Sequence, residues 1–123
     1  MSEKQTTYGL KHDQGKQSFY FMPLAMLEPL ADVFLAGVKK GYPPFNCLLP
    51  FQDGDRRLYD AMMRHAAASQ IDPLSINHED GGVFNLAQVA FCALTRLHNA
   101  LNARAGTPEW LAAQIAEQRK KTP

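Results

Sequence analysis

The sequence contains few cysteines and almost no net charge. Cys47 and Cys92 are the two cysteines among 123 residues, and they form no CxxC motif. This usage argues against a disulfide-stapled scaffold and is typical of a protein in a reducing compartment. Thirteen basic and twelve acidic residues leave a formal charge of +1. No strong field attracts nucleic acid or an anionic membrane, and we expect neither as a partner.

Long apolar runs and the commonest catalytic motifs are also absent from the sequence. No uninterrupted apolar segment approaches the about twenty residues that a membrane-spanning helix needs. Residues 1–5 lack the apolar core of a signal peptide, so we expect a cytoplasmic protein. The sequence has no P-loop, no dinucleotide-binding GxGxxG, no HExxH and no GxSxG. Common NTPases, dehydrogenases, zinc proteases and serine hydrolases therefore have no motif support.

Helical periodicity is the main structural signal that is present. It predicts four helices, at about 23–40, 56–69, 83–104 and 107–120. No two alternating apolar runs indicate a β-hairpin, so we expect none. The third helix has the widest apolar stripe, which consists of Val83, Leu86, Ala87, Ala90, Leu94, Leu97 and Leu101. An apolar arc of this width predicts burial on more than one side of the helix.

The ends of the first two helices carry recognisable signals. Pro29 either begins the first helix or kinks it, and Gly41 is suited to end it. Asp53 or Asp55 is suited to cap the second helix. Between them, residues 42–54 contain three prolines and no helical period. This pattern predicts a loop whose apolar side chains form a lid or an oligomer contact.

These elements predict an all-α bundle in a single domain. Three principal helices leave apolar surface uncovered, so we expect oligomerisation to complete the bundle, as a homodimer or homotetramer. The chain then divides into an N-terminal arm at 1–22, a helical core at 23–106, and a C-terminal helix with a basic tail at 107–123.

The side chains suited to binding a ligand or to catalysis lie in four places in the sequence. The run Lys11-His12-Asp13-Gln14-Gly15-Lys16 is a candidate phosphate clamp in the arm. Glu28 and Asp32 are four residues apart, so their carboxylates share a helix face and repel unless a cation or proton lies between them. The alternative is a solvent-facing acidic pair near a helix start.

The second and third helices contribute the other two places. Asp60 precedes Arg64 by four residues, and a surface ion pair between them is an alternative to a metal role. His65 shares an apolar face, where a lone histidine is more often a core residue. Glu79 and Asp80 precede the longest helix, whose free backbone N–H groups can receive an anion. A capping loop is the alternative reading, and it accounts for Asp80.

Taken in order, these segments resemble a known family. The set is Lys11-x-Asp13-x-Gly15-Lys16, Met22-Pro23, Glu28, the run 37–42 (GVKKGY), Asn46, the run 57–65 (RLYDAMMRH), Asp72-Pro73 and Asp80-Gly81-Gly82. It resembles the phage and prophage dATP/dGTP diphosphohydrolase group, which is similar to the MazG-like all-α nucleoside triphosphate pyrophosphohydrolases. The resemblance covers about residues 11–101. It implies a MazG-like helical bundle that hydrolyses a purine (deoxy)nucleoside triphosphate to the monophosphate and pyrophosphate, with Mg²⁺, or with Mn²⁺ in its place.

The resemblance also implies roles for individual residues. The implied metal ligands are Glu28, Asp32, Asp60, Glu79 and Asp80. The implied substrate-binding residues are Lys11, Asp13, Lys16, Lys39, Asn46 and Arg64. Asp60 and His65 are the implied catalytic residues.

Three positions depart from the family pattern. Leu35 stands where relatives tend to have a glutamate, and Asn85 and Gln88 stand where the third helix often opens with histidines. Amide side chains bind hard cations poorly. These departures support a second hypothesis, in which the protein keeps the pocket and sequesters a nucleotide without turnover. A third, weaker hypothesis is a protein-interaction factor that uses the apolar loop at 42–51.

Overall fold

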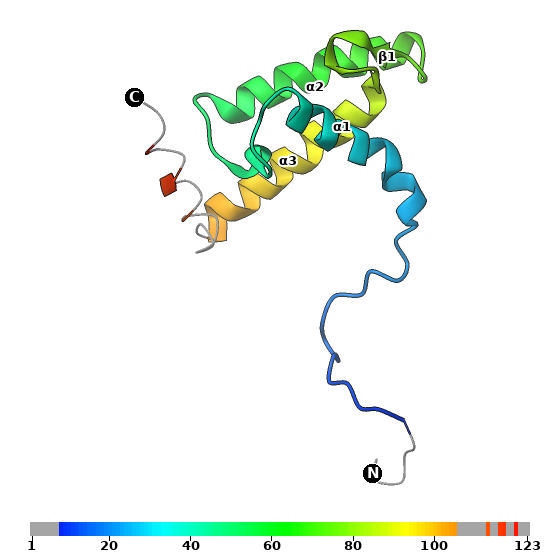
Figure 1. Ribbon diagram of the computed structural model, residues 1–123, viewed down its shortest axis with the longest axis vertical. Helices are drawn as coiled ribbons and strands as arrows, with labels where there is room; N and C mark the ends of the chain where they lie inside the picture. The colour runs from blue at the N-terminus through cyan, green and yellow to red at the C-terminus, as the bar shows by residue number, and fades with distance from the viewer. Residues whose placement is uncertain (1–7, 106–112, 114–115, 118–119, 121–123) are drawn as a thin grey trace.

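A computed structural model describes residues 8–105 together with residues 113, 116, 117 and 120. It consists of three α-helices and a small hairpin (Figure 1). The elements are a 3-10 turn at Leu24–Leu27, α1 at Glu28–Lys39, a 3-10 turn at Asn46–Leu48, α2 at Gly54–Ile71, β1 at Ile76–Asn77, a 3-10 turn at His78–Asp80, β2 at Val83–Phe84 and α3 at Asn85–Ala105. The mostly helical character is confirmed. The predicted helix at 107–120 lies largely outside the described residues.

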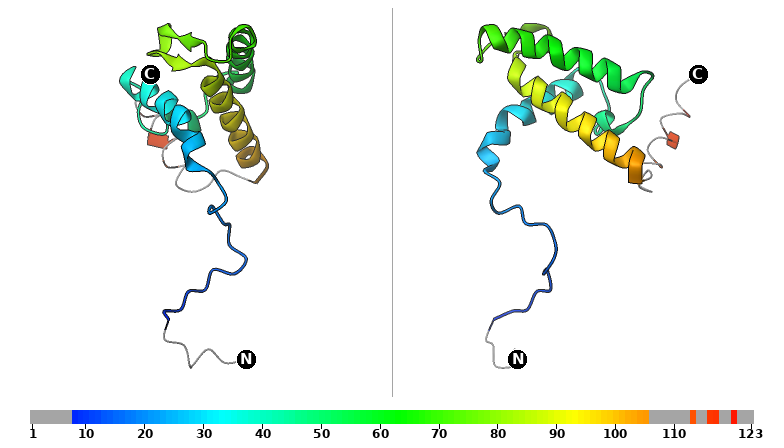
Figure 2. Two further views of the ribbon diagram at one scale, coloured as in Figure 1. Left: turned by 90° about the vertical axis from the view of Figure 1, so that its right-hand side faces the viewer. Right: turned by 180° about the vertical axis from the view of Figure 1, so that it is seen from behind.

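Residues 8–22 run away from the helices as an extended segment without a helix or strand (Figures 1 and 2). Within it, the candidate phosphate clamp forms a tight turn, in which the Lys16 amide donates to the Asp13 carbonyl at 3.0 Å. Gly15 takes a left-handed φ of 84° in this turn. The aromatic side chains that follow are well exposed, with 65% of Phe19 and 88% of Tyr20 open to solvent.

The helix α1 starts and stops where its sequence signals indicate. It begins at Glu28 with Pro29 in the first turn, where a missing N–H costs nothing, so the alternative in which the proline opens the helix is the correct one. Its last residue is Lys39. Gly41 then adopts a φ of 99°, and the Tyr42 amide donates back to the Gly37 carbonyl at 3.1 Å. This is the glycine stop that the sequence predicts.

The core lies between α2 and α3, with α1 packed across α3 (Figure 2). Leu58, Met62 and Cys92 form its centre. The rings of Phe34 on α1 and Phe91 on α3 meet edge to face at 5.2 Å between centroids. This contact holds α1 against α3.

The predicted side-chain cap of α2 is wrong. Asp53 occupies the N-cap position, but with a left-handed φ of 54° its side chain makes no capping hydrogen bond. Asp55 lies in the first turn and instead bonds to Arg96 on α3 at 2.8 Å. The helix is also two residues longer at each end than its periodicity predicts.

The expectation of no β-hairpin is also wrong. Strands β1 and β2 pair antiparallel, with Ile76 opposite Phe84 and Asn77 opposite Val83. Two residues per strand are too few for an alternating pattern to be visible in the sequence. The connection includes Gly81 and Gly82, both with left-handed φ, at 80° and 82°. Because Val83 and Phe84 belong to the hairpin, α3 begins at Asn85.

The apolar stripe of α3 is only partly covered within one chain. Val83, just before the helix, and Ala87 are buried. The large side chains remain about half open, with exposed fractions of 46% for Leu86, 52% for Leu94, 56% for Leu97 and 52% for Leu101. The described residues of one chain therefore leave the leucine side of α3 about half open. No helix in the described part of the chain is long and apolar enough to cross a membrane.

Candidate functional site

Residues from four separate segments meet at the end of the molecule where the hairpin joins α3. Lys40 comes from the end of α1, His65 from α2, Asp80 from the hairpin connection, and Asn85 and Gln88 from the first turn of α3. We call this group the polar site. Asn85 and Gln88 are both buried, at 6% and 7% exposed, so their amides lie in the protein rather than in water.

Asp80 is the centre of one half of the polar site. Its Oδ1 forms an ion pair with Lys40. Its Oδ2 accepts hydrogen bonds from the side-chain amides of Gln88 at 2.8 Å and Asn77 at 3.1 Å. Asn77 also donates to Gln88 Oε1 at 2.9 Å. One cation and two amides thus satisfy this carboxylate, which joins the hairpin to both α1 and α3.

His65 is the centre of the other half. Its Nδ1 lies 3.2 Å from Asn85 Oδ1, and Asn85 Nδ2 donates to Ser75 Oγ at 3.1 Å. Because the Asn85 amide nitrogen faces Ser75, its oxygen faces the histidine, which makes Nδ1 the protonated ring nitrogen. Nε2 makes no hydrogen bond to any residue that the structure describes. The imidazole therefore offers an open lone pair.

The electrostatic surroundings keep this ring neutral. Burial is the main reason that the pKa of His65 lies below its ordinary value, and the positive charges of Arg64 and Lys40 lower it further. The hydrogen bond to Asn85 opposes this shift. A histidine with a lowered pKa is unprotonated at neutral pH, so Nε2 is able to accept a proton.

The five predicted metal ligands are distributed over the chain. Glu28 and Asp32 are exposed on the first turns of α1, and Glu79 is exposed beside Asp80. Asp60 accepts a hydrogen bond from Arg56 at 3.2 Å, so a surface ion pair does form, as in the alternative to a metal role, but with the arginine one turn before Asp60 and not with Arg64. Across the described residues, no three His, Cys, Asp or Glu side chains are grouped closely enough to hold a metal.

The residues that the structure describes in one chain are therefore a poor fit for Mg²⁺. A hard divalent cation needs several oxygen ligands with available lone pairs. Asp80, the carboxylate of the polar site, already forms an ion pair with Lys40 and accepts hydrogen bonds from two side-chain amides. The roles of Glu28, Asp32 and Asp60 as ligands remain predictions.

The predicted phosphate-binding residues are also spread out. Lys11, Asp13 and Lys16 lie on the extended arm, and Lys39 and Arg64 are exposed on α1 and α2. The sequence interpretation missed Lys40, Ser75 and Asn77 as members of the polar site. Lys39 and Lys40 are adjacent, and a helix turns about 100° per residue, so the pattern alone does not decide which lysine faces the hairpin.

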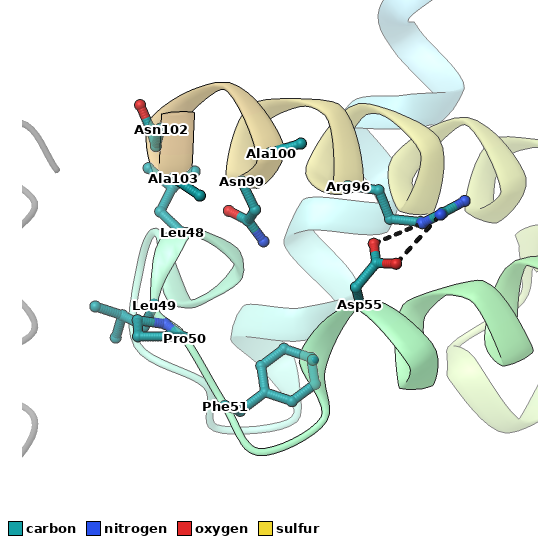
Figure 3. A pocket seen from close by; sticks show the side chains of 11 residues that line it. Leu48, Leu49, Pro50, Phe51, Asp55, Arg96, Asn99, Ala100, Asn102 and Ala103 are labelled. Carbon is teal, nitrogen blue, oxygen red and sulfur yellow. Dashed lines mark hydrogen bonds and ion pairs between the residues drawn. The ribbon is translucent and has the colours of Figure 1, made fainter. Parts of the chain in front are cut away.

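Two pockets open beside the loop at 42–51. The larger, which we call the aromatic pocket, has a volume of about 730 Å³ and is lined by residues of α1, the loop, α2 and α3, including Phe34, Tyr42, Phe45, Asn46, Arg57 and Phe91. The second pocket, of about 420 Å³, lies between the end of this loop and the later turns of α3 (Figure 3). At its wall Arg96 holds Asp55 with two bonds, of 2.8 and 3.3 Å. The hydrogen bond from Arg96 keeps the pKa of Asp55 below its ordinary value.

These features define a mostly helical protein with a hairpin-supported polar site. The family model for the N-terminal domain of dATP/dGTP diphosphohydrolase matches residues 6–108, and the chain belongs to this family. No curated protein and no solved structure matches the chain significantly.

Proposed function

We propose that this protein hydrolyses a purine (deoxy)nucleoside triphosphate to the monophosphate and pyrophosphate. The observation that carries the proposal is the meeting of Lys40, His65 and Asp80 at one place in a chain of the dATP/dGTP diphosphohydrolase family. Each comes from a different segment of the ordered set that resembles this family.

Within this proposal, His65 acts as general base. Its Nδ1 proton is held by Asn85, and its open Nε2 takes a proton from the attacking water. Lys39, the exposed sequence neighbour of Lys40, and the arm residues Lys11 and Lys16 supply positive charge for the phosphate oxygens. Asp13, Asn46 and Arg64 complete the proposed substrate contacts.

The family resemblance implies Mg²⁺, with Mn²⁺ as a substitute, and such an ion would neutralise the triphosphate. One chain does not group three carboxylates among its described residues. The assay below therefore measures how pyrophosphate release depends on Mg²⁺, Mn²⁺ and a chelator.

We also propose that the protein is a homo-oligomer with a MazG-like bundle. The half-exposed leucines of α3 form a continuous apolar face, and burial against a second copy removes that surface from water. A homodimer or a homotetramer satisfies this requirement.

The second candidate function is sequestration of a nucleotide without turnover. One observation favours it: Asp80 is neutralised by Lys40 and held by Gln88, an amide at a position where relatives often have histidine. A carboxylate in this state supports the hairpin and contributes little to hydrolysis.

One assay separates the two functions. The full chain is incubated with each of the eight common nucleoside triphosphates and with Mg²⁺, Mn²⁺ or a chelator. Pyrophosphate release and nucleotide retention in equilibrium dialysis are measured together. Pyrophosphate from dATP or dGTP supports the hydrolase. Retention without pyrophosphate under every metal condition supports sequestration, and absence of both contradicts both functions.

Asp60 gives a variant that tests the hydrolase further. If Asp60 contributes to turnover, Asp60→Ala lowers kcat by orders of magnitude while circular dichroism shows an intact helical fold. Arg56→Ala is the matched control, because it removes the ion-pair partner of Asp60 and leaves the carboxylate. Equal rates for Asp60→Ala and the wild type would remove Asp60 from the catalytic set.

A further inference from the structure

The aromatic pocket has the composition of a site for a flat heterocyclic ring. Its volume of about 730 Å³ lies within the range of about 300–1,000 Å³ that small-molecule sites occupy. Aromatic side chains from α1, α3 and the loop line it, including Phe34, Phe91, Tyr42 and Phe45. Rings of this kind stack on nucleobases without regard to sequence.

Two polar side chains in the pocket lining have free hydrogen-bonding capacity. The half-buried side-chain amide of Asn46 makes no hydrogen bond to any described residue. Arg57 makes one weak bond, at 3.5 Å to the Gln52 carbonyl, and its guanidinium is held over the Phe51 ring at 5.1 Å. In the second pocket, by contrast, Arg96 is committed to Asp55.

An amide and a guanidinium are the side chains that match the edges of purines. An asparagine amide donates to and accepts from N7 and N6 of adenine, and an arginine donates to O6 and N7 of guanine. Both groups occur in the lining of the same pocket, in a chain whose family is named for dATP and dGTP.

The backbone strain at Phe45 is a second, independent observation that favours a ligand site at this loop. It adopts a φ of 63°, in the left-handed region that a bulky side chain rarely enters. Its ring is 63% exposed, so the strain is not compensated by burial of the side chain. Backbone strain of this kind occurs often at ligand clamps.

The pocket is also at a suitable distance from the polar site. Leu58 lines the pocket and His65 lies seven residues later on α2, which is about 10 Å along the helix axis. Phe91 and Asn85 on α3 are six residues apart, which is about 9 Å. The end of α1 contributes residues to both sites, since Gly37 and Val38 line the aromatic pocket and Lys40 forms an ion pair with Asp80 in the polar site.

We propose that the aromatic pocket receives the purine base of the nucleotide, with Asn46 and Arg57 facing the edge of the base and Phe45 stacking on it. This inference rests on the proposed function, because it places the base of the same nucleotide whose phosphates extend toward His65.

Cys47 provides a probe of pocket occupancy that is independent of turnover. Its thiol lies half-buried in the pocket lining, whereas Cys92 is buried in the core at 3% exposure and serves as an internal reference. Burial raises the pKa of the Cys47 thiol, so alkylation by iodoacetamide is followed at mildly alkaline pH. The rate at Cys47 is measured by peptide mass spectrometry with dATP, dGTP, 2′-deoxyadenosine or inorganic triphosphate present.

We expect dATP, dGTP and 2′-deoxyadenosine to slow alkylation of Cys47, and inorganic triphosphate to leave it unchanged. Dialysis-detected binding of dATP without protection of Cys47 overturns the pocket assignment and leaves the proposed function standing. Protection by dATP or dGTP without pyrophosphate release from them supports the pocket and counts against the hydrolase. Protection by inorganic triphosphate alone also overturns the assignment, because it places phosphate and not the base beside Cys47.

A pair of glycine variants separates ligand binding from backbone strain. Phe45→Gly relieves a left-handed φ and removes the ring, so it should leave the thermal midpoint unchanged or higher while it weakens dATP binding about tenfold. Asp53→Gly relieves the similar φ of 54° outside the pocket and should not change binding. Equal dATP affinity for Phe45→Gly and the wild type overturns the stacking role of Phe45.

Discussion

His65 and Asn85 lie on different helices, and the hydrogen bond between them decides which ring nitrogen carries the proton. The sequence shows His65 on an apolar face, where a lone histidine is more often a core residue than a functional one. In the structure the ring has one structural and one available nitrogen. Nδ1 is hydrogen-bonded inside the protein, and Nε2 makes no hydrogen bond to the described residues. Asn85 stands where the family resemblance implies a histidine, and in this chain its side-chain oxygen holds the Nδ1 side of the His65 ring.

The lowered pKa of His65 predicts a pH dependence of stability. The unfolded chain has the ordinary histidine pKa of about 6.5, and burial places the folded value below it. Between these two values the unfolded state binds more protons, so the free energy of unfolding falls as the pH drops below about 6.5. His65→Gln removes this titration, and urea unfolding at a series of pH values should show a smaller loss of stability on acidification. Identical pH profiles for variant and wild type would contradict a lowered pKa.

Among the elements, the helices were predictable and the hairpin was not. Proline near the start of α1 and glycine after its end fix that helix by local backbone chemistry, which a sequence displays. The hairpin depends on Asn77, Asp80 and Gln88, whose bonds join residues up to eleven positions apart. For the same reason, sequence reasoning found Asp80 but not Lys40 or Asn77. Contacts across elements carry no periodic signal.

The bonds of Asp80 predict that it stabilises the hairpin. Asp80→Ala leaves the amide nitrogen of the buried Gln88 without its acceptor, whereas the Asn77 amide keeps Gln88 Oε1, and an unsatisfied buried group costs about 1–3 kcal/mol of unfolding free energy. Glu79→Ala is the matched control, because Glu79 is the exposed acidic neighbour and its change should stay within about 0.5 kcal/mol. Chemical unfolding measures both variants. Equal stabilities would mean that the Asp80 contacts contribute nothing to the fold.

At the scale of the whole molecule, the core formed by Leu58, Met62 and Cys92 is small, and much apolar surface stays open. Leu94, Leu97 and Leu101 follow one another at intervals of three and four residues on α3, which is the spacing of a helix–helix seam. Each is more than half exposed. The sequence predicted burial on more than one side of this helix, and among the residues that the structure describes no further layer covers these leucines.

A second copy of the chain is the partner that we expect on this face. Leu97→Glu places a charge in the centre of the seam and should convert the oligomer to a monomer, because burial of an unpaired carboxylate is strongly unfavourable. Leu74→Glu is the control, since Leu74 is 71% exposed in the turn between α2 and β1 and lies away from the seam. Light scattering at micromolar concentration measures the mass of each variant. A monomeric wild type would contradict the oligomer, whereas an oligomeric Leu97→Glu variant would place the interface on another surface.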